Sequence, residues 1–141
     1  MEVAWALPCR FAEATPDGTA TIVGAGLDSM FISEVPADVG VFLMMRIAGP
    51  QYEFQEQHSV AVKLIDPERD EQDILEAGFG PVEELPPAYH PGLDPGVLLP
   101  AAIGWRAEHF GLYTLEIYVD GRRTRSVPIL VRDSQEIQPA G

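Results

Sequence analysis

The chain has 141 residues, of which 46% are hydrophobic, and a formal net charge of −13 at pH 7. A chain of this length buries roughly two-thirds of its unfolded surface, so a single domain can hold a core without metals or disulfides. The charge argues against nucleic acid and anionic membranes as partners, because both attract lysine and arginine. With no basic leader and no apolar run of about 18 residues, the sequence predicts a cytoplasmic protein.

The first third of the chain predicts short strands separated by turns. Residues 3–12 alternate bulky and small side chains as one strand does, and Pro8 lacks an amide donor, which indicates a sheet edge or a bulge. A Pro-Asp-Gly turn at 16–18 precedes expected strands at 19–25 and 29–35. Residues 39–47 are apolar on both faces, which favours a central strand covered on both sides or a strand whose outer face is an interface.

The middle of the chain is acidic and then rich in proline. A strand is expected at 59–65, an acidic turn at 66–73 and a short strand at 74–79. Six prolines then fall between residues 80 and 100, which indicates a functional loop or a loosely ordered segment. Apolar residues resume on either side of the last of them, at 97–103.

The strongest local signal is a hairpin over residues 112–131, because Asp120-Gly121 separates two β-rich runs. A two-residue loop places the apolar residues of the two strands on opposite faces, unless a bulge occurs near Ser126. A three-residue loop, which pairs Tyr118 with Arg122, places them on one face. Register follows the buried face, so the three-residue loop is the predicted one.

These elements amount to about eight or nine short strands with turn residues throughout and no amphipathic helix. The pattern is typical of an all-β fold, an antiparallel β-sandwich of immunoglobulin-like or C2-like type, with a barrel as the alternative. We expect a single domain over residues 1–133, with a proline-rich loop at 80–100 and a frayed tail at 134–141.

Three segments resemble a family of short, uncharacterised bacterial proteins that are common in actinobacteria. They are residues 5–9 (WALPC), residues 22–28 (IVGAGLD) and the strand and turn at 113–121. The resemblance spans nearly the whole chain and implies a β-sandwich. It implies no activity, cofactor or catalytic residue.

Motifs for catalysis and metal binding are weak. Cys9 is the only cysteine, which excludes an internal disulfide and a cysteine-based zinc site. His58, His90 and His109 lack the close spacing that brings two metal ligands together on one element. No nucleophile motif is present, so we expect a protein that is not an enzyme and has no cofactor.

The acidic turn offers weak calcium candidates with carboxylate oxygens, the ligands that calcium prefers. They are Asp66, Glu68, Asp70 and Asp73. The turn does not match the EF-hand pattern, because Glu71 stands where that loop requires glycine. An ordinary solvated turn explains the same residues.

Protein contacts are the first functional hypothesis, with a protein partner or a homo-oligomer. The apolar strand at 39–47 and several aromatic residues suggest an interface. The interface candidates are Phe42, Met44, Tyr89, Trp105 and Tyr118. For the aromatic residues, the favoured interpretation is that most of them close the open ends of the sandwich. The alternative function is a ligand- or calcium-binding module that uses the 66–73 turn or the 80–96 loop.

Overall fold

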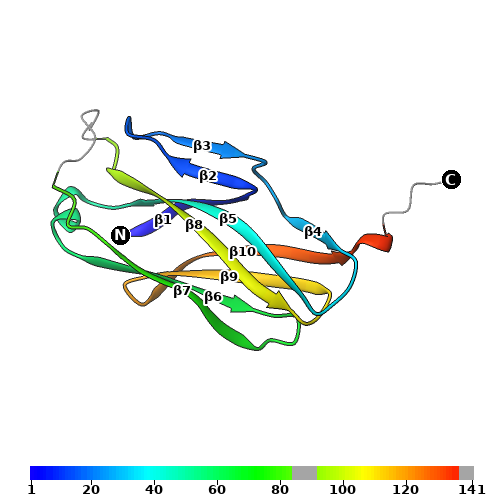
Figure 1. The fold of residues 1–141 in the computed structure, drawn as a ribbon. Helices are drawn as coiled ribbons and strands as arrows, with labels where there is room; N and C mark the ends of the chain where they lie inside the picture. The colour runs from blue at the N-terminus through cyan, green and yellow to red at the C-terminus, as the bar shows by residue number, and fades with distance from the viewer. Residues whose placement is uncertain (84–91, 137–141) are drawn as a thin grey trace.

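The computed structural model describes residues 1–83 and 92–136, and this part of the chain is all-β, without an α-helix (Figure 1). The elements in chain order are β1 (Glu2–Cys9), β2 (Phe11–Ala14), β3 (Ala20–Val23), β4 (Ser29–Ile32), β5 (Ala37–Ala48), the 3-10 helix η1 (Gln51–Gln55), β6 (His58–Ile65), β7 (Glu71–Phe79), β8 (Gly96–Ala107), β9 (Gly111–Val119), β10 (Arg122–Asp133) and the 3-10 helix η2 (Ser134–Glu136). None of these helices is long and apolar enough to cross a membrane.

The strands form several sheets. One has the order β1-β5-β8, a second has the order β4-β10-β9-β6-β7, and β2 pairs with β3 as a separate hairpin. The pairs are antiparallel except β4 with β10, which is parallel and so departs from the purely antiparallel expectation. These two strands are far apart in sequence, so no short turn imposes an antiparallel arrangement on them.

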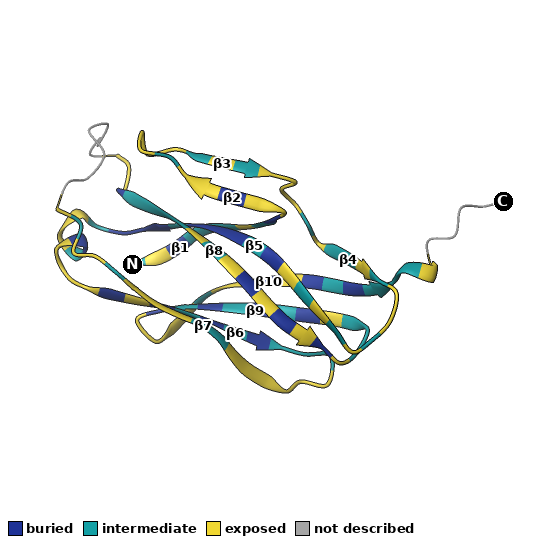
Figure 2. Cartoon of the chain, viewed as in Figure 1, coloured by how far each residue is buried: buried dark blue, intermediate teal, exposed yellow. Residues whose placement is uncertain are grey.

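The two larger sheets share one hydrophobic core (Figure 2). Alternate residues of β9 and β10 point into it, as the sequence predicts, among them the fully buried Leu115, Ile117 and Ile129. Leu43 and Ile47 of β5 enter the same core from the other sheet. The two-residue periodicity of the strands therefore decides which side chains are buried.

The β9–β10 hairpin shows that the predicted three-residue loop is wrong. Val119 pairs with Arg122 across a two-residue turn, in which Asp120 (φ +52°) and Gly121 (φ +80°) are both left-handed. A bulge between Arg123 and Arg125 then restores the apolar residues to one face. The alternative register, with its bulge close to Ser126, is the one that occurs.

This bulge also joins the two larger sheets. The hydroxyl of Thr124 accepts a hydrogen bond from the Val3 amide at 3.3 Å, and Arg125 donates to the Ala4 carbonyl at 2.8 Å. These contacts satisfy backbone groups on the side of β1 that has no neighbouring strand. The bulge thus protects an exposed sheet edge.

The outer face of β5 is covered by the β2–β3 hairpin. The expected single strand at 3–12 is interrupted at Arg10, and β2 crosses over the three-stranded sheet to pair with β3 (Figure 1). Cys9, Ala12 and Met44 form a second, smaller core beneath it. Strand β5 is therefore central and covered on both sides, which confirms the first interpretation of its doubly apolar sequence.

Several boundaries differ from the expectations. Strand β7 begins at Glu71, within the expected acidic turn, and β8 begins at Gly96 and continues through Pro100. A proline is compatible with β8 because this strand lies at the edge of its sheet. Residues 134–136 form η2. The rest of the expected tail, 137–141, and residues 84–91 of the expected proline-rich loop lie outside the described part.

Candidate functional site

The outer face of the five-stranded sheet carries an exposed apolar patch at the end near β4. Its members all lie on the side of the sheet that faces away from the core. We call this set the outer patch: Phe31, Ile65, Leu112, Pro128 and Leu130. Leu112 pairs directly with Leu130, and the exposed fractions of Phe31 and Leu112 are 42% and 54%. Exposed apolar residues that adjoin one another are typical of an interaction surface.

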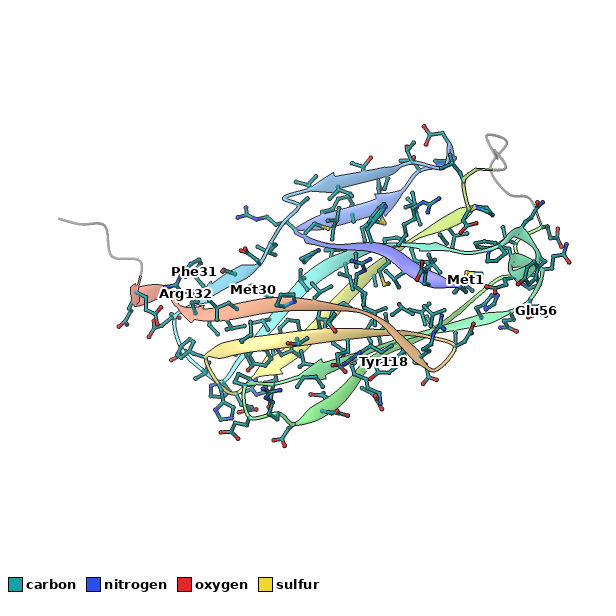
Figure 3. The ribbon with its side chains drawn as sticks, turned by 180° about the vertical axis from the view of Figure 1, so that it is seen from behind. Met1, Met30, Phe31, Glu56, Tyr118 and Arg132 are labelled. Carbon is teal, nitrogen blue, oxygen red and sulfur yellow. The ribbon has the colours of Figure 1, made fainter. Side chains whose placement is uncertain are left out.

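Arg132, which lies beside the outer patch, is already neutralised. Arg132 pairs with Phe31 across β10 and β4, and its guanidinium lies 5.4 Å from the centre of that ring (Figure 3). It also forms an ion pair with Glu136 at 3.1 Å. Met30 and Ile32 pack against the core, so β4 presents Ser29 and Phe31 to this side, of which only Phe31 is apolar.

The other end of the same face is polar. Tyr118 donates a hydrogen bond to Glu116 at 3.1 Å, Arg123 pairs with Glu116 at 3.0 Å, and the Lys63 ammonium lies 5.2 Å from the Tyr118 ring. Desolvation, followed by the neighbouring Glu116, raises the pKa of the Tyr118 hydroxyl. These side chains bind one another, so this end offers little unsatisfied surface.

The interface candidates from the sequence are placed in different environments. Met44 is fully buried beneath the β2–β3 hairpin and Trp105 is 5% exposed in the main core, so neither can contact a partner on the folded surface. Phe42 is half-buried and packs edge-on against Phe11, with the ring centres 5.4 Å apart. Tyr118 lies on the polar end of the outer face, and Tyr89 lies outside the described residues.

The calcium candidates do not converge on one point. Asp66 Oδ1 accepts hydrogen bonds from the amides of Glu68 and Asp70, both at 2.9 Å, and so closes the β6–β7 turn. Arg69 completes this turn with a φ of +72°. Nowhere in residues 1–83 and 92–136 do three acidic, histidine or cysteine side chains gather as metal ligands would.

Buried His58 forms a polar cluster at one end of the molecule. Its Nδ1 lies 2.6 Å from Asp120 Oδ2, and its Nε2 lies 2.5 Å from the Glu53 carbonyl oxygen. The ring stacks on Phe79 at 5.3 Å. Burial alone would lower the pKa of His58, but the Glu53 carbonyl and Asp120 outweigh it and raise this pKa. The cluster joins η1 to the β9–β10 turn, and Asp120 also accepts a hydrogen bond from the Ser59 amide at 3.0 Å.

The sequence interpretation missed the residues that make the outer patch. Leu112 occupies the same side of β9 as Thr114 and Glu116, and Leu130 lies between the inward-facing residues of β10. The outward direction of both leucines could therefore have been inferred from the alternation. Their association with Phe31 could not, because it depends on the parallel pairing of two strands from opposite ends of the chain.

An all-β domain with an apolar outer face and no assembled metal cluster in its described part is the class that the geometry defines. Residues 4–132 match DUF6941, a family of unknown function, and the chain belongs to this family. No specific function follows from the membership.

Comparisons with individual proteins add little. No curated protein is significantly similar to this chain. A solved structure, Pseudomonas fluorescens alkylpurine DNA glycosylase AlkC bound to DNA containing an abasic site analog, resembles it with a TM-score of 0.43 and 9% sequence identity. The match covers 76% of this chain and 28% of the glycosylase.

Proposed function

We propose that this chain is a non-catalytic, cytoplasmic β-sandwich of a bacterium that acts through protein contacts and associates with a second copy through the outer patch. The common core of the two larger sheets supports an immunoglobulin-like sandwich. The observation that carries the functional proposal is the exposure of Phe31 and Leu112 beside Leu130 on one sheet face.

Electrostatics favours this face for self-association. Two copies that each carry a net charge of −13 repel one another at most approaches. The outer patch contains no acidic residue, and the adjacent Arg132 is paired with Glu136. A two-fold arrangement would place Leu112 of each copy in the same interface, because a symmetric dimer uses one surface twice.

Solution mass by size exclusion with light scattering tests this proposal. We expect a dimer that persists at high salt, because apolar contacts are not screened. Leu112→Asp should make the protein monomeric, since two buried leucines contribute about 3–6 kcal/mol to such a dimer. Val23→Asp is the matched control, because Val23 is 52% exposed and Leu112 is 54% exposed.

A wild-type protein that is monomeric at every concentration would overturn self-association. Equal loss of the dimer in Leu112→Asp and Val23→Asp would assign the contact to a surface other than the outer patch. Circular dichroism of both variants shows whether the fold is retained, which separates loss of association from unfolding.

A further inference from the structure

A cleft lies between the β2–β3 hairpin and the end of the three-stranded sheet. The hairpin lies on the side of this sheet that faces away from β6, β7 and β9 (Figure 1), and so away from the outer patch. The volume of the cleft is about 550 Å³, within the range of small-molecule sites. The cleft is lined, among others, by Trp5 on β1, Ile22 on β3, Arg46 on β5, and Gly96 and Leu98 on β8.

The cleft exists because the hairpin is shorter than the sheet beneath it. Strands β2 and β3 have four residues each, whereas β5 has 12. The hairpin covers Met44 completely, but Arg46, two residues further along the same face of β5, is left partly exposed. Trp5, Ile22 and Leu98 border the small core under the hairpin and continue into the cleft as its apolar walls.

Arg46 is held in place without a carboxylate partner. Its Nη2 donates to the Asp94 carbonyl at 3.2 Å, and a Cβ on Gly96 would lie 2.6 Å from its Cζ, so the guanidinium lies directly against the Gly96 backbone. No acidic side chain in the described part of the chain forms an ion pair with Arg46. A guanidinium has five N–H donors, so most of them are available here to a ligand.

The chemistry of the walls defines the ligand further. Trp5 provides a flat aromatic surface and an indole N–H that forms no hydrogen bond with the described residues. Leu98 lies on the other side of Arg46 from Trp5 in the same sheet, and Ile22 of the hairpin adds a third apolar wall. An arginine fork binds a carboxylate through two parallel hydrogen bonds, and the apolar walls suit a ring of limited thickness.

We propose that this cleft binds a small planar monocarboxylate, with the carboxylate on the Arg46 guanidinium and the ring between Trp5, Ile22 and Leu98. The single uncompensated cation selects one negative charge. The exposed Asp94 at the rim disfavours a ligand with a second one. This site is separate from the outer patch and does not depend on self-association.

Titration with 1-naphthoate, followed by NMR of the ¹⁵N-labelled protein, tests the proposal. The chain has two tryptophans, so its indole region holds an internal comparison. We expect saturable shifts of the Trp5 indole N–H, whereas the indole of Trp105, which is 5% exposed in the core, stays in place. The neutral analogue 1-naphthamide should bind about tenfold more weakly or not at all, because it cannot form the charged fork.

Two variants and one control assign the binding to the proposed groups. Arg46→Met keeps the side-chain length, removes the charge and should weaken naphthoate binding about tenfold or more. Leu93→Glu should also weaken it, because it places a negative charge at the rim of the cleft, at a side chain that is 67% exposed. Arg106→Gln, on the same strand as Gly96 but paired with Asp38, should bind like wild type.

The absence of saturable shifts with wild-type protein would overturn the proposal. So would equal affinity for naphthoate and naphthamide, or an Arg46→Met variant that is folded and binds as wild type does. Shifts of the Trp105 indole without shifts of the Trp5 indole would place the ligand elsewhere and refute the cleft.

Discussion

Asp120→Asn tests the charged state of buried His58. Both ring nitrogens of His58 face oxygen acceptors, Asp120 on one side and the Glu53 carbonyl on the other, so both nitrogens must carry protons to satisfy them. Asparagine is well suited to the left-handed turn position at 120. Its amide oxygen can still accept the hydrogen bond of the Ser59 amide, which Asp120 accepts at 3.0 Å.

The expected cost of this substitution is about 1–2 kcal/mol at acidic pH. Hydrogen bonds to charged groups contribute about 1.5–3 kcal/mol, and the Asp120 side chain is 45% exposed, so water screens the pair and brings the expected cost to the lower end of that range and somewhat below it. The asparagine amide donates to a neutral His58 ring, so the variant loses little once His58 is deprotonated.

The pH dependence follows from the direction of the two pKa shifts. The folded-state pKa of His58 is raised, so its stabilising contribution is complete below the unfolded pKa of about 6.5 and is lost as pH rises through the higher folded value. The pKa of Asp120 is lowered, since the Ser59 amide and His58 outweigh its burial, so this carboxylate stays ionised through the same range.

Urea unfolding of wild type and Asp120→Asn at about pH 5.5 and about pH 8.5 measures the effect on both sides of the histidine titration. We expect a clear difference in unfolding free energy at the lower pH and a smaller one at the higher pH. An NMR titration of His58 should show a lower pKa in the variant. An equal loss of stability at both pH values would refute a charged His58.

Three further substitutions or additions test other parts of the structure. Met44→Ala should lower the unfolding free energy by about 2–4 kcal/mol, because Met44 is fully buried under the hairpin, whereas Leu93→Ala at a 67% exposed site should change it by less than about 0.5 kcal/mol. Gly121→Ala should lower the unfolding free energy by about 1 kcal/mol in the same urea assay, because the φ of Gly121 is +80°. Beyond the neighbouring residues, nothing lies within 4 Å of the added methyl group, so backbone strain alone causes the loss. Gly104→Ala is the control, because Gly104 has no such φ. Calcium should leave the melting temperature unchanged, because Asp66 Oδ1 already accepts hydrogen bonds from two backbone amides. An ion that binds, added at 100 times its dissociation constant, would stabilise the fold by about 2.7 kcal/mol. A rise of several degrees in the melting temperature would therefore contradict the prediction.

The features that could be predicted are those encoded over a few neighbouring residues. Alternation gave the inward residues of β9 and β10, and the missing amide of Pro8 correctly indicated an edge strand. The Asp120-Gly121 pair correctly located a turn, because left-handed backbone favours these residue types. The doubly apolar sequence of β5 correctly allowed for a strand covered on both faces.

The features that could not be predicted depend on contacts between distant segments. The register of the β9–β10 hairpin depends on a bulge. Thr124 and Arg125 in this bulge bind Val3 at the free edge of β1, which lies 121 and 122 residues earlier in the chain. Met44 was predicted to be an interface residue, but the β2–β3 hairpin, which is distant in sequence, covers it. Local periodicity cannot report which segment covers a given face.

The sequence by itself determined an all-β chain, its turns and the inward face of most strands, because backbone conformation and side-chain alternation are local properties. Only the tertiary structure decided the parallel pairing of β4 with β10, which assembles the outer patch, and the short reach of the β2–β3 hairpin, which leaves Arg46 and Trp5 at a cleft. Both surfaces arise where distant strands meet, since the free energy of such contacts comes from burial between segments and leaves no periodic signal within either one.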